Sequence, residues 1–263
     1  MRHVPASRPM LPPRRLPESF PVRSAVLLTL ALLVLGRPAA ADGFTPQQRD
    51  EIVRLLRDAL RSDPSILREA LAGLQADDAR RQEAVSRDLI KMLGSKLIDP
   101  ADPVAGNPLG PVTIVEFYDP RCPYCRTMLP TLAELLRSDP NVRLVAKDWP
   151  ILGPASQLES RALLAAQRQG GYFKLQAALM QDGGQPSRDT LRAQADALGL
   201  DGGRLMRDMD DPAIKTRLEA TMALAQQLGL QGTPALIIGD RLFGGALELG
   251  DLRQAVAEAT AVK

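Results

Sequence analysis

The order of sequence patterns predicts an α/β protein, built from a strand–helix–strand unit and a strand–strand–helix unit with a helical insertion between them. Three observations predict this class. The first is a pair of β-branched apolar runs, Val112–Phe117 and Val142–Lys147, which flank a helical pattern and are therefore expected to pair in parallel. The second is a series of helical patterns over residues 155–229. The third is a predicted hairpin, Ala235–Phe243, followed by a terminal helix over Leu249–Ala261.

Residues 1–41 have the pattern of a secretory signal peptide. Arg23 precedes the apolar run Ala25–Leu35, which is much shorter than the roughly 20 residues that span a bilayer. The small residues Ala39–Ala41 offer a cleavage site before Asp42. A short buried helix or an uncleaved anchor is the alternative. Export predicts a periplasmic location, where an oxidising environment lets cysteine pairs form disulfides.

Residues 42–98 are expected to form an N-terminal helical segment, because apolar side chains recur there at helical spacing. Thr45 is suited to cap the first helix and Pro46 to begin it. Asp63-Pro64 ends that helix and starts another. These helices have apolar faces but few bulky side chains to bury between them. The apolar faces therefore need another surface, either the following domain or copies of the same segment, and the sequence leaves both open.

Four prolines and two glycines in residues 99–111 predict a linker, followed by a domain over residues 112–263. The helical insertion in this domain is expected to begin with a capping box formed by Ser156 and Glu159. Pro212 is expected to open the last helix of the insertion.

The composition excludes several functions. The one histidine, His3, lies in the predicted signal peptide, so Ser-His-Asp triads and histidine-ligated metals are excluded for the exported chain. Without residues 1–41, 27 basic and 30 acidic residues remain, a net charge of −3. Aromatic residues make up only 3%. Nucleic acid therefore has neither an electrostatic nor a stacking case as a partner, and an anionic membrane surface has no electrostatic case.

The two cysteines, Cys122 and Cys125, form a Cys-Pro-Tyr-Cys motif where a predicted strand meets a predicted helix. This spacing lets the thiols close a disulfide across one helical turn. At a helix N-terminus the first thiolate is stabilised by unpaired backbone N–H groups and the helix dipole, which makes Cys122 the expected nucleophile and Cys125 the resolving thiol. Pro123 limits the backbone freedom of the ring. Arg121 and Arg126 flank the motif and either support the thiolate or point to solvent.

Three further residues are candidates for the same site. Thr233-Pro234 directly precedes a predicted strand, and a cis peptide bond there would expose the Thr233 backbone to an extended peptide. An ordinary trans proline is the alternative. Glu116 lies in the first predicted strand, where a buried carboxyl would exchange protons with the thiols. A solvent-facing Glu116 is the alternative, and Lys147 is a candidate partner for its carboxylate.

The cysteine pair has alternatives to redox exchange. A zinc site needs two more ligands, and the exported chain has no other cysteine and no histidine. A two-coordinate copper(I) site of thiolates remains an alternative, and so does a periplasmic copper(I) carrier as the function. An inert structural disulfide is a further alternative, although so small a loop would stabilise little.

Motifs in three distant parts of the chain together resemble the DsbA family of thiol–disulfide oxidoreductases, which has a thioredoxin fold with a helical insertion. The motifs are Phe117-Tyr118-Asp119 with Cys122-Pro123-Tyr124-Cys125, Trp149-Pro150-Ile151-Leu152-Gly153, and Gly232-Thr233-Pro234-Ala235. Their order and spacing are similar to the ScsC-like branch of secreted members, over residues 104–260.

The resemblance implies a role for each matching residue. Cys122 attacks and Cys125 resolves. Pro234 is cis, and Glu116 relays protons. No metal or organic cofactor is required. Related proteins oligomerise through an N-terminal helical segment, and residues 44–98 match that segment in position and pattern.

The residues around the thiols are expected to bind clients and set the direction of exchange. These are Pro123, Tyr124, Thr233 and Pro234. Thr233 stands where the oxidase DsbA has valine and is similar to the disulfide isomerases, and Tyr124 stands where that oxidase has histidine. Oxidation, isomerisation and reduction therefore stay open.

We expect the chain to exchange disulfides with cysteine-containing exported proteins and a membrane redox partner to recycle its thiol pair. A glutaredoxin shares Cys-Pro-Tyr-Cys but is disfavoured by the export signal and the insertion. A last alternative makes residues 44–98 an assembly module attached to a vestigial redox domain.

Overall fold

The computed structural model describes residues 43–261, so the predicted signal peptide lies outside the described residues. The chain divides into two compact units between Ala70 and Leu71. Within residues 43–261, no helix is long and apolar enough to cross a bilayer.

The first unit contains helix α2 (Pro46–Ser62) and the start of α3 (Ser65–Leu93). The predicted cap of α2 is confirmed: the Thr45 hydroxyl accepts from the Gln48 amide, and the Gln48 side chain accepts from the Thr45 amide. No residue of α2 is buried. Most large apolar side chains of this unit are exposed, namely Phe44, Val53, Leu55, Leu56, Ile66 and Leu67, whereas Ile52 and Leu60 are half-buried.

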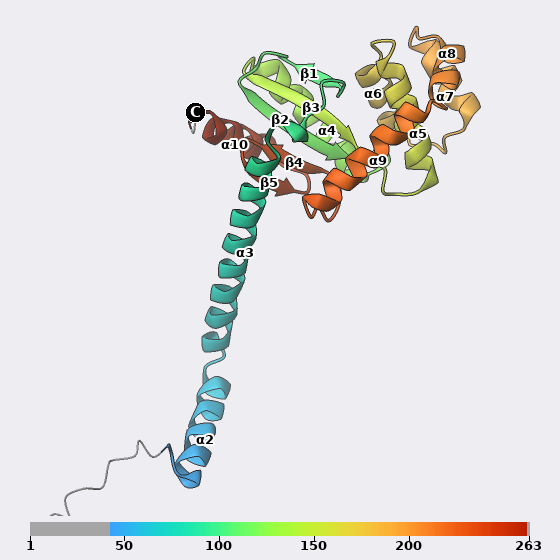
Figure 1. The fold of residues 1–263 in the computed structure, drawn as a ribbon. Coiled ribbons are helices and arrows are strands. Elements are labelled where there is room, and N and C mark those ends of the chain that lie inside the picture. Colours follow the sequence, from blue (N-terminus) through green and yellow to red (C-terminus); the bar gives the residue numbers. More distant parts are fainter. Residues whose placement is uncertain (1–42, 262–263) are drawn as a thin grey trace, which may run out of the picture. The chain divides into compact units, whose positions relative to one another are not determined.

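The second unit is organised around a five-stranded sheet in the order β1-β3-β2-β4-β5 (Figure 1). The strands β2 and β3 pair in parallel, as predicted, and all other pairs are antiparallel. The strands are β1 (Val104–Gly106), β2 (Val112–Tyr118), β3 (Val142–Asp148), β4 (Ala235–Ile238) and β5 (Arg241–Gly244).

Each face of the sheet is covered by helices. Side chains alternate between the two faces of a strand, so the apolar strands present apolar side chains to helices on both faces. On one face Ile114 packs with apolar side chains of α4 (Pro123–Ser138) and α10 (Leu249–Ala261). On the other face, Val115 and Phe117 pack with Trp149 and with three helical segments. These are the end of α3, the 3-10 helix η1 (Gly94–Leu97) and the end of α9 (Pro212–Gln227). This two-sided core holds the end of β2, where the thiol motif follows.

The insertion consists of five helices with their own apolar core, which includes Leu163, Leu175 and Leu191 and continues to Cys122 and Cys125. The helices are α5 (Pro154–Gln167), α6 (Tyr172–Asp182), α7 (Arg188–Ala197), α8 (Gly202–Asp208) and α9 (Pro212–Gln227). The thiol motif is thus packed directly against the insertion.

Two local expectations were wrong. The predicted linker over residues 99–111 contains β1, which pairs with β3 and forms an edge of the sheet. The predicted capping box of Ser156 and Glu159 does not form, because α5 begins at Pro154. Gly153 precedes it with a φ of 109°, a value that favours glycine.

Candidate active site

The two thiols lie at the N-terminus of α4, as predicted. Cys122 is the N-cap residue, and Pro123 follows at the first helical position. Both cysteines are free and buried, with exposures of 4% for Cys122 and 1% for Cys125. The Cys122 thiol donates to the Thr233 carbonyl oxygen, with 3.2 Å between sulfur and oxygen. The Cys122 thiol therefore lies at the start of α4 and directly contacts Thr233, which is 111 positions away in the sequence.

Asp119 shapes the turn that carries Cys122. Its carbonyl accepts from the Cys122 amide at 3.0 Å. Its buried carboxylate accepts from the amides of Arg121, at 2.8 Å, and Leu152, at 2.9 Å. The second bond joins the turn to the segment after β3. Asp119 was assigned no role from the sequence. An Asp side chain that accepts from the amide two residues later forms an Asx-turn, which is a known turn signal.

The peptide bond between Thr233 and Pro234 is cis, which confirms the prediction. Pro234 directly precedes β4, whose first residue, Ala235, is paired with Phe117 at the end of β2. This pairing brings the Thr233 carbonyl to Cys122. Tyr124, by contrast, is 67% exposed beside the thiols and is free to contact a partner.

Glu116 is buried under the site, at 4% exposure, so the solvent-facing alternative is wrong. Burial, and secondarily the charge of Asp148, raise the pKa of Glu116 to about 8. Burial is also the main reason that the pKa of the Cys125 thiol is raised, and the charge of Glu116 contributes to it. Glu116 therefore lies close enough to Cys125 to affect its thiol, and with a pKa of about 8 it carries a proton at neutral pH.

Asp148, at the end of β3, is a second buried carboxyl on the same face as Glu116. It accepts from the Tyr172 hydroxyl at 2.8 Å and from the Tyr118 hydroxyl at 3.2 Å. The two hydroxyls lie 2.7 Å apart. Burial raises the pKa of Asp148 to about 7 although both tyrosines favour the ionised form. Sequence reasoning missed this group.

Lys147 does not pair with Glu116, and that expectation was wrong. Lys147 is in register with Phe117, so its side chain lies on the opposite face of the sheet from Glu116. There the Lys147 ammonium pairs with Asp102, with 2.5 Å between nitrogen and oxygen, and both side chains are buried. Arg217 of α9 also approaches Asp102, at 3.4 Å.

The Arg121 side chain points to the helical insertion and not to solvent. Its guanidinium donates to Glu159 of α5 at 2.9 Å and to the Gly184 carbonyl at 2.8 Å. Burial raises the pKa of Glu159, and the bond to Arg121 opposes that shift. Arg121 thus ties the thiol turn to the insertion.

Among residues 43–261, no group of three or more histidine, cysteine, aspartate or glutamate side chains is placed to hold a metal ion.

Buried paired thiols at a helix start, opposite a cis-proline at a strand start, define a redox site of the thioredoxin fold. Residues 113–257 match the family model of the DSBA-like thioredoxin domain, and the chain belongs to that family. It is a DsbA-like thiol–disulfide oxidoreductase with a Cys-x-x-Cys pair at Cys122 and Cys125.

Solved structures agree with this assignment. A thioredoxin-like oxidoreductase from Silicibacter pomeroyi is 44% identical, with a TM-score of 0.61 over 64% of this chain and 96% of that chain. The thiol-disulfide exchange protein alpha-DsbA2 from Wolbachia pipientis is 29% identical, with a TM-score of 0.64 over 68% and 97%. A Proteus mirabilis ScsC variant is 26% identical, with a TM-score of 0.62 over 87% and 100%. The predicted resemblance to ScsC is confirmed.

Curated relatives include a different kind of protein. The Na(+)/H(+) antiporter NhaA 1 of Salinispora arenicola is 31% identical over 189 residues. The match covers 70% of this chain but only 29% of the antiporter. The antiporter's activity is therefore not transferred to this chain.

Proposed function

We propose that this chain is exported to the periplasm and exchanges disulfides with cysteine-containing exported proteins through Cys122. The observation that carries the proposal is the position of the Cys122 sulfur, at the start of α4 and 3.2 Å from the Thr233 carbonyl oxygen. A client bound along Thr233 would present its cysteine to this sulfur.

In the oxidising direction, a client thiolate attacks the Cys122 sulfur of the Cys122–Cys125 disulfide. The S–S bond breaks, and its electron pair goes to the Cys125 sulfur. A second client thiolate then attacks the client sulfur of the mixed disulfide and expels Cys122. The client loses two electrons and the chain gains them, until a membrane redox partner reoxidises the pair. Reduction and isomerisation use the same bonds in other orders.

Glu116 supplies the proton in this proposal. Because burial raises the pKa of the Cys125 thiol, a bare Cys125 thiolate is a poor leaving group. Glu116 carries a proton at neutral pH, since its pKa is about 8. Its proton can therefore pass toward the Cys125 sulfur as the disulfide opens, and return when the disulfide forms again.

Pro123, Tyr124, Thr233 and Pro234 bind the client in this proposal. The exposed ring of Tyr124 and the backbone of Thr233 flank the sulfur that a client must reach. No cofactor takes part. The copper(I) carrier requires two thiolates, and burial of Cys125 disfavours the second.

We further propose that copies of the chain associate through residues 44–98. The exposed apolar side chains of α2 support this, because an amphipathic helix with no buried residue needs a partner surface. Leu56→Asp should lower the mass measured by light scattering. An unchanged mass would contradict association through this helix.

A trapping experiment tests the exchange itself. With Cys125→Ser, a client disulfide attacked by Cys122 cannot be resolved, so a mixed disulfide should accumulate. The matched control, Cys122→Ser, should trap nothing. Equal trapping by both variants would contradict the assigned roles, and stoichiometric copper(I) binding without exchange would replace the proposed function.

A further inference from the structure

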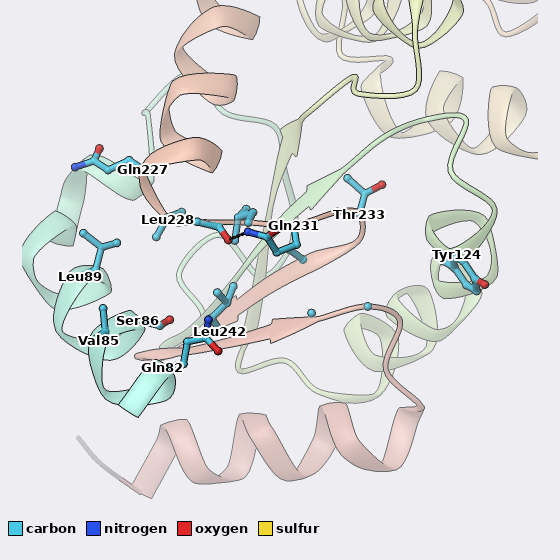
Figure 2. Close-up of a pocket in the computed structure, with 16 residues that line it drawn as sticks. Gln82, Val85, Ser86, Leu89, Tyr124, Gln227, Leu228, Gln231, Thr233 and Leu242 are labelled. Carbon is cyan, nitrogen blue, oxygen red and sulfur yellow. Dashed lines mark hydrogen bonds between the residues drawn. The ribbon is translucent and has the colours of Figure 1, made fainter. Parts of the chain in front are cut away.

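A groove of about 780 Å³ opens beside the thiol site, within the second unit. Figure 2 shows α3, with Val85 and Leu89, on one side of it and Tyr124 on the far side. Thr233 and Leu242 lie between them. Thr233 also accepts from the Cys122 thiol, so one lining residue of the groove is in contact with the reacting sulfur.

The groove is uncharged. No lysine, arginine, aspartate or glutamate is among its lining residues, although such residues make up 24% of the chain. Charges occur beside it as pairs that join α3 to the hairpin: Lys91 with Asp240 at 3.2 Å, and Glu83 with Arg241 at 3.5 Å. The chemistry of the lining therefore favours an uncharged occupant over an acidic or basic one.

The groove also offers backbone groups for an extended chain. β5 is an edge strand, and the Gly245 amide, just after it, donates inward to the Pro234 carbonyl at 2.8 Å. Since backbone groups alternate in direction along an antiparallel strand, those of Gly244 and Leu242 face the open side. Gly244 leaves space, because a Cβ there would meet no atom within 4 Å. An edge strand with exposed backbone groups accepts an added strand.

Helix α3 supplies the opposite wall. Leu89 is half-buried against the core under the sheet, which fixes that part of the helix, whereas Val85 is 67% exposed one turn earlier. Val85 belongs to none of the buried core clusters, yet it lines the groove. An exposed apolar side chain in such a position suits contact with an apolar group that enters the groove.

We propose that Val85 and Leu89 of α3 form a specificity wall for clients, which selects an extended client segment with uncharged apolar side chains next to its cysteine. The inference rests on the proposed exchange at Cys122 and extends it. The N-terminal helical segment then has a direct part in client choice, separate from any part in association.

The test uses the full exported chain in its oxidised form and two synthetic peptides. Each has one cysteine, flanked by leucine and valine in one peptide and by aspartate in the other. The wild-type chain should react faster with the apolar peptide, and Val85→Glu should reduce that rate about tenfold. Val85→Leu should retain it. Met92→Glu is the matched control, because Met92 is 72% exposed on the same helix but lies outside the groove.

Dithiothreitol separates the wall from the chemistry, since it is too small to need a groove. Val85→Glu should react with dithiothreitol at the wild-type rate. An apolar-peptide rate within twofold of wild type would overturn the proposal, as would an equal loss with dithiothreitol. A lower mass of the variant by light scattering would also overturn it, because a second copy would then occupy the groove. Failure of the wild-type chain to react with any thiol would instead remove the proposed function.

Discussion

The two faces of the strand pair β2 and β3 both bury ionisable groups, but the groups have different partners on each face. On one face Lys147 and Asp102 form a direct ion pair, with Arg217 nearby. On the other, Glu116 and Asp148 are two acids with no buried cation bonded to either, among the interactions of residues 43–261, and only tyrosine hydroxyls bind Asp148.

The difference separates structure from chemistry. The ion pairs of Lys147 and Arg217 with Asp102 join β3 and α9 to the segment just before β1, which is a structural role. Burial disfavours the charged form of Glu116 and of Asp148, so the pKa values of both are raised toward neutrality, and the charge of Asp148 adds to the shift of Glu116. A proton carrier for a buried thiol requires such a group.

The largest effect is expected where the ion pair is broken. Lys147→Met should destabilise the fold by about 3 kcal/mol, because it takes the nearest cation from buried Asp102 and leaves Arg217, at 3.4 Å, as the remaining one. Urea denaturation measures this. The double variant Lys147→Met with Asp102→Asn should recover a large part of the loss. A single variant as stable as the wild type would show that this face is not held by its charges.

The next effect concerns Glu116 and pH. An acid whose pKa is raised in the folded state stabilises the fold at low pH, and this stabilisation is lost as the pH rises from about 4.5 to about 8. Glu116→Gln should remove this part of the decline, roughly 1 kcal/mol per pH unit, and leave the part due to Asp148. Denaturation midpoints across this range measure it. Parallel wild-type and variant curves would contradict a raised pKa.

A smaller effect is expected from the neighbour of Glu116. Asp148→Asn removes the charge that helps to raise the pKa of Glu116, so that pKa should fall below about 8, by roughly 1 unit. Infrared or NMR titration of the Glu116 carboxyl follows the change. A midpoint that stays in place would mean that burial alone sets the pKa.

The smallest effect is expected at Tyr172. Tyr172→Phe removes one of the two hydroxyls that stabilise the ionised Asp148, so the pKa of Asp148 should rise above about 7. The fold should lose about 1 kcal/mol, the usual worth of one hydrogen bond. Carboxyl titration and urea denaturation check both. A lowered pKa of Asp148 would contradict the assigned hydrogen bond.

The features of the site that were predictable from the sequence differ from those that were not. The thiol motif, the strand ends and the Thr233-Pro234 pair were predictable, because each is a local pattern with a local physical meaning. The Lys147 partner was predicted wrongly, although the alternation of β3 already places Lys147 opposite to Ala146.

Long-range partners were beyond the reach of local patterns. Tyr172 meets Asp148 from 24 residues away, and Glu159 meets Arg121 from 38 away. Both contacts depend on how the insertion packs on the sheet. The wall formed by Val85 was likewise invisible, since an amphipathic stripe does not identify the surface that it faces.

The redox equilibrium of the chain without residues 1–41, measured in glutathione buffers, tests whether Cys122 and Cys125 exchange disulfides. One two-electron transition of the Cys122–Cys125 pair is expected. A potential near about −120 mV would indicate an oxidase, and about −180 to −230 mV an isomerase or reductase. The transition should be absent in Cys122→Ser. If no Cys122–Cys125 disulfide formed at any ratio of glutathione to its disulfide, disulfide exchange through this pair would be contradicted.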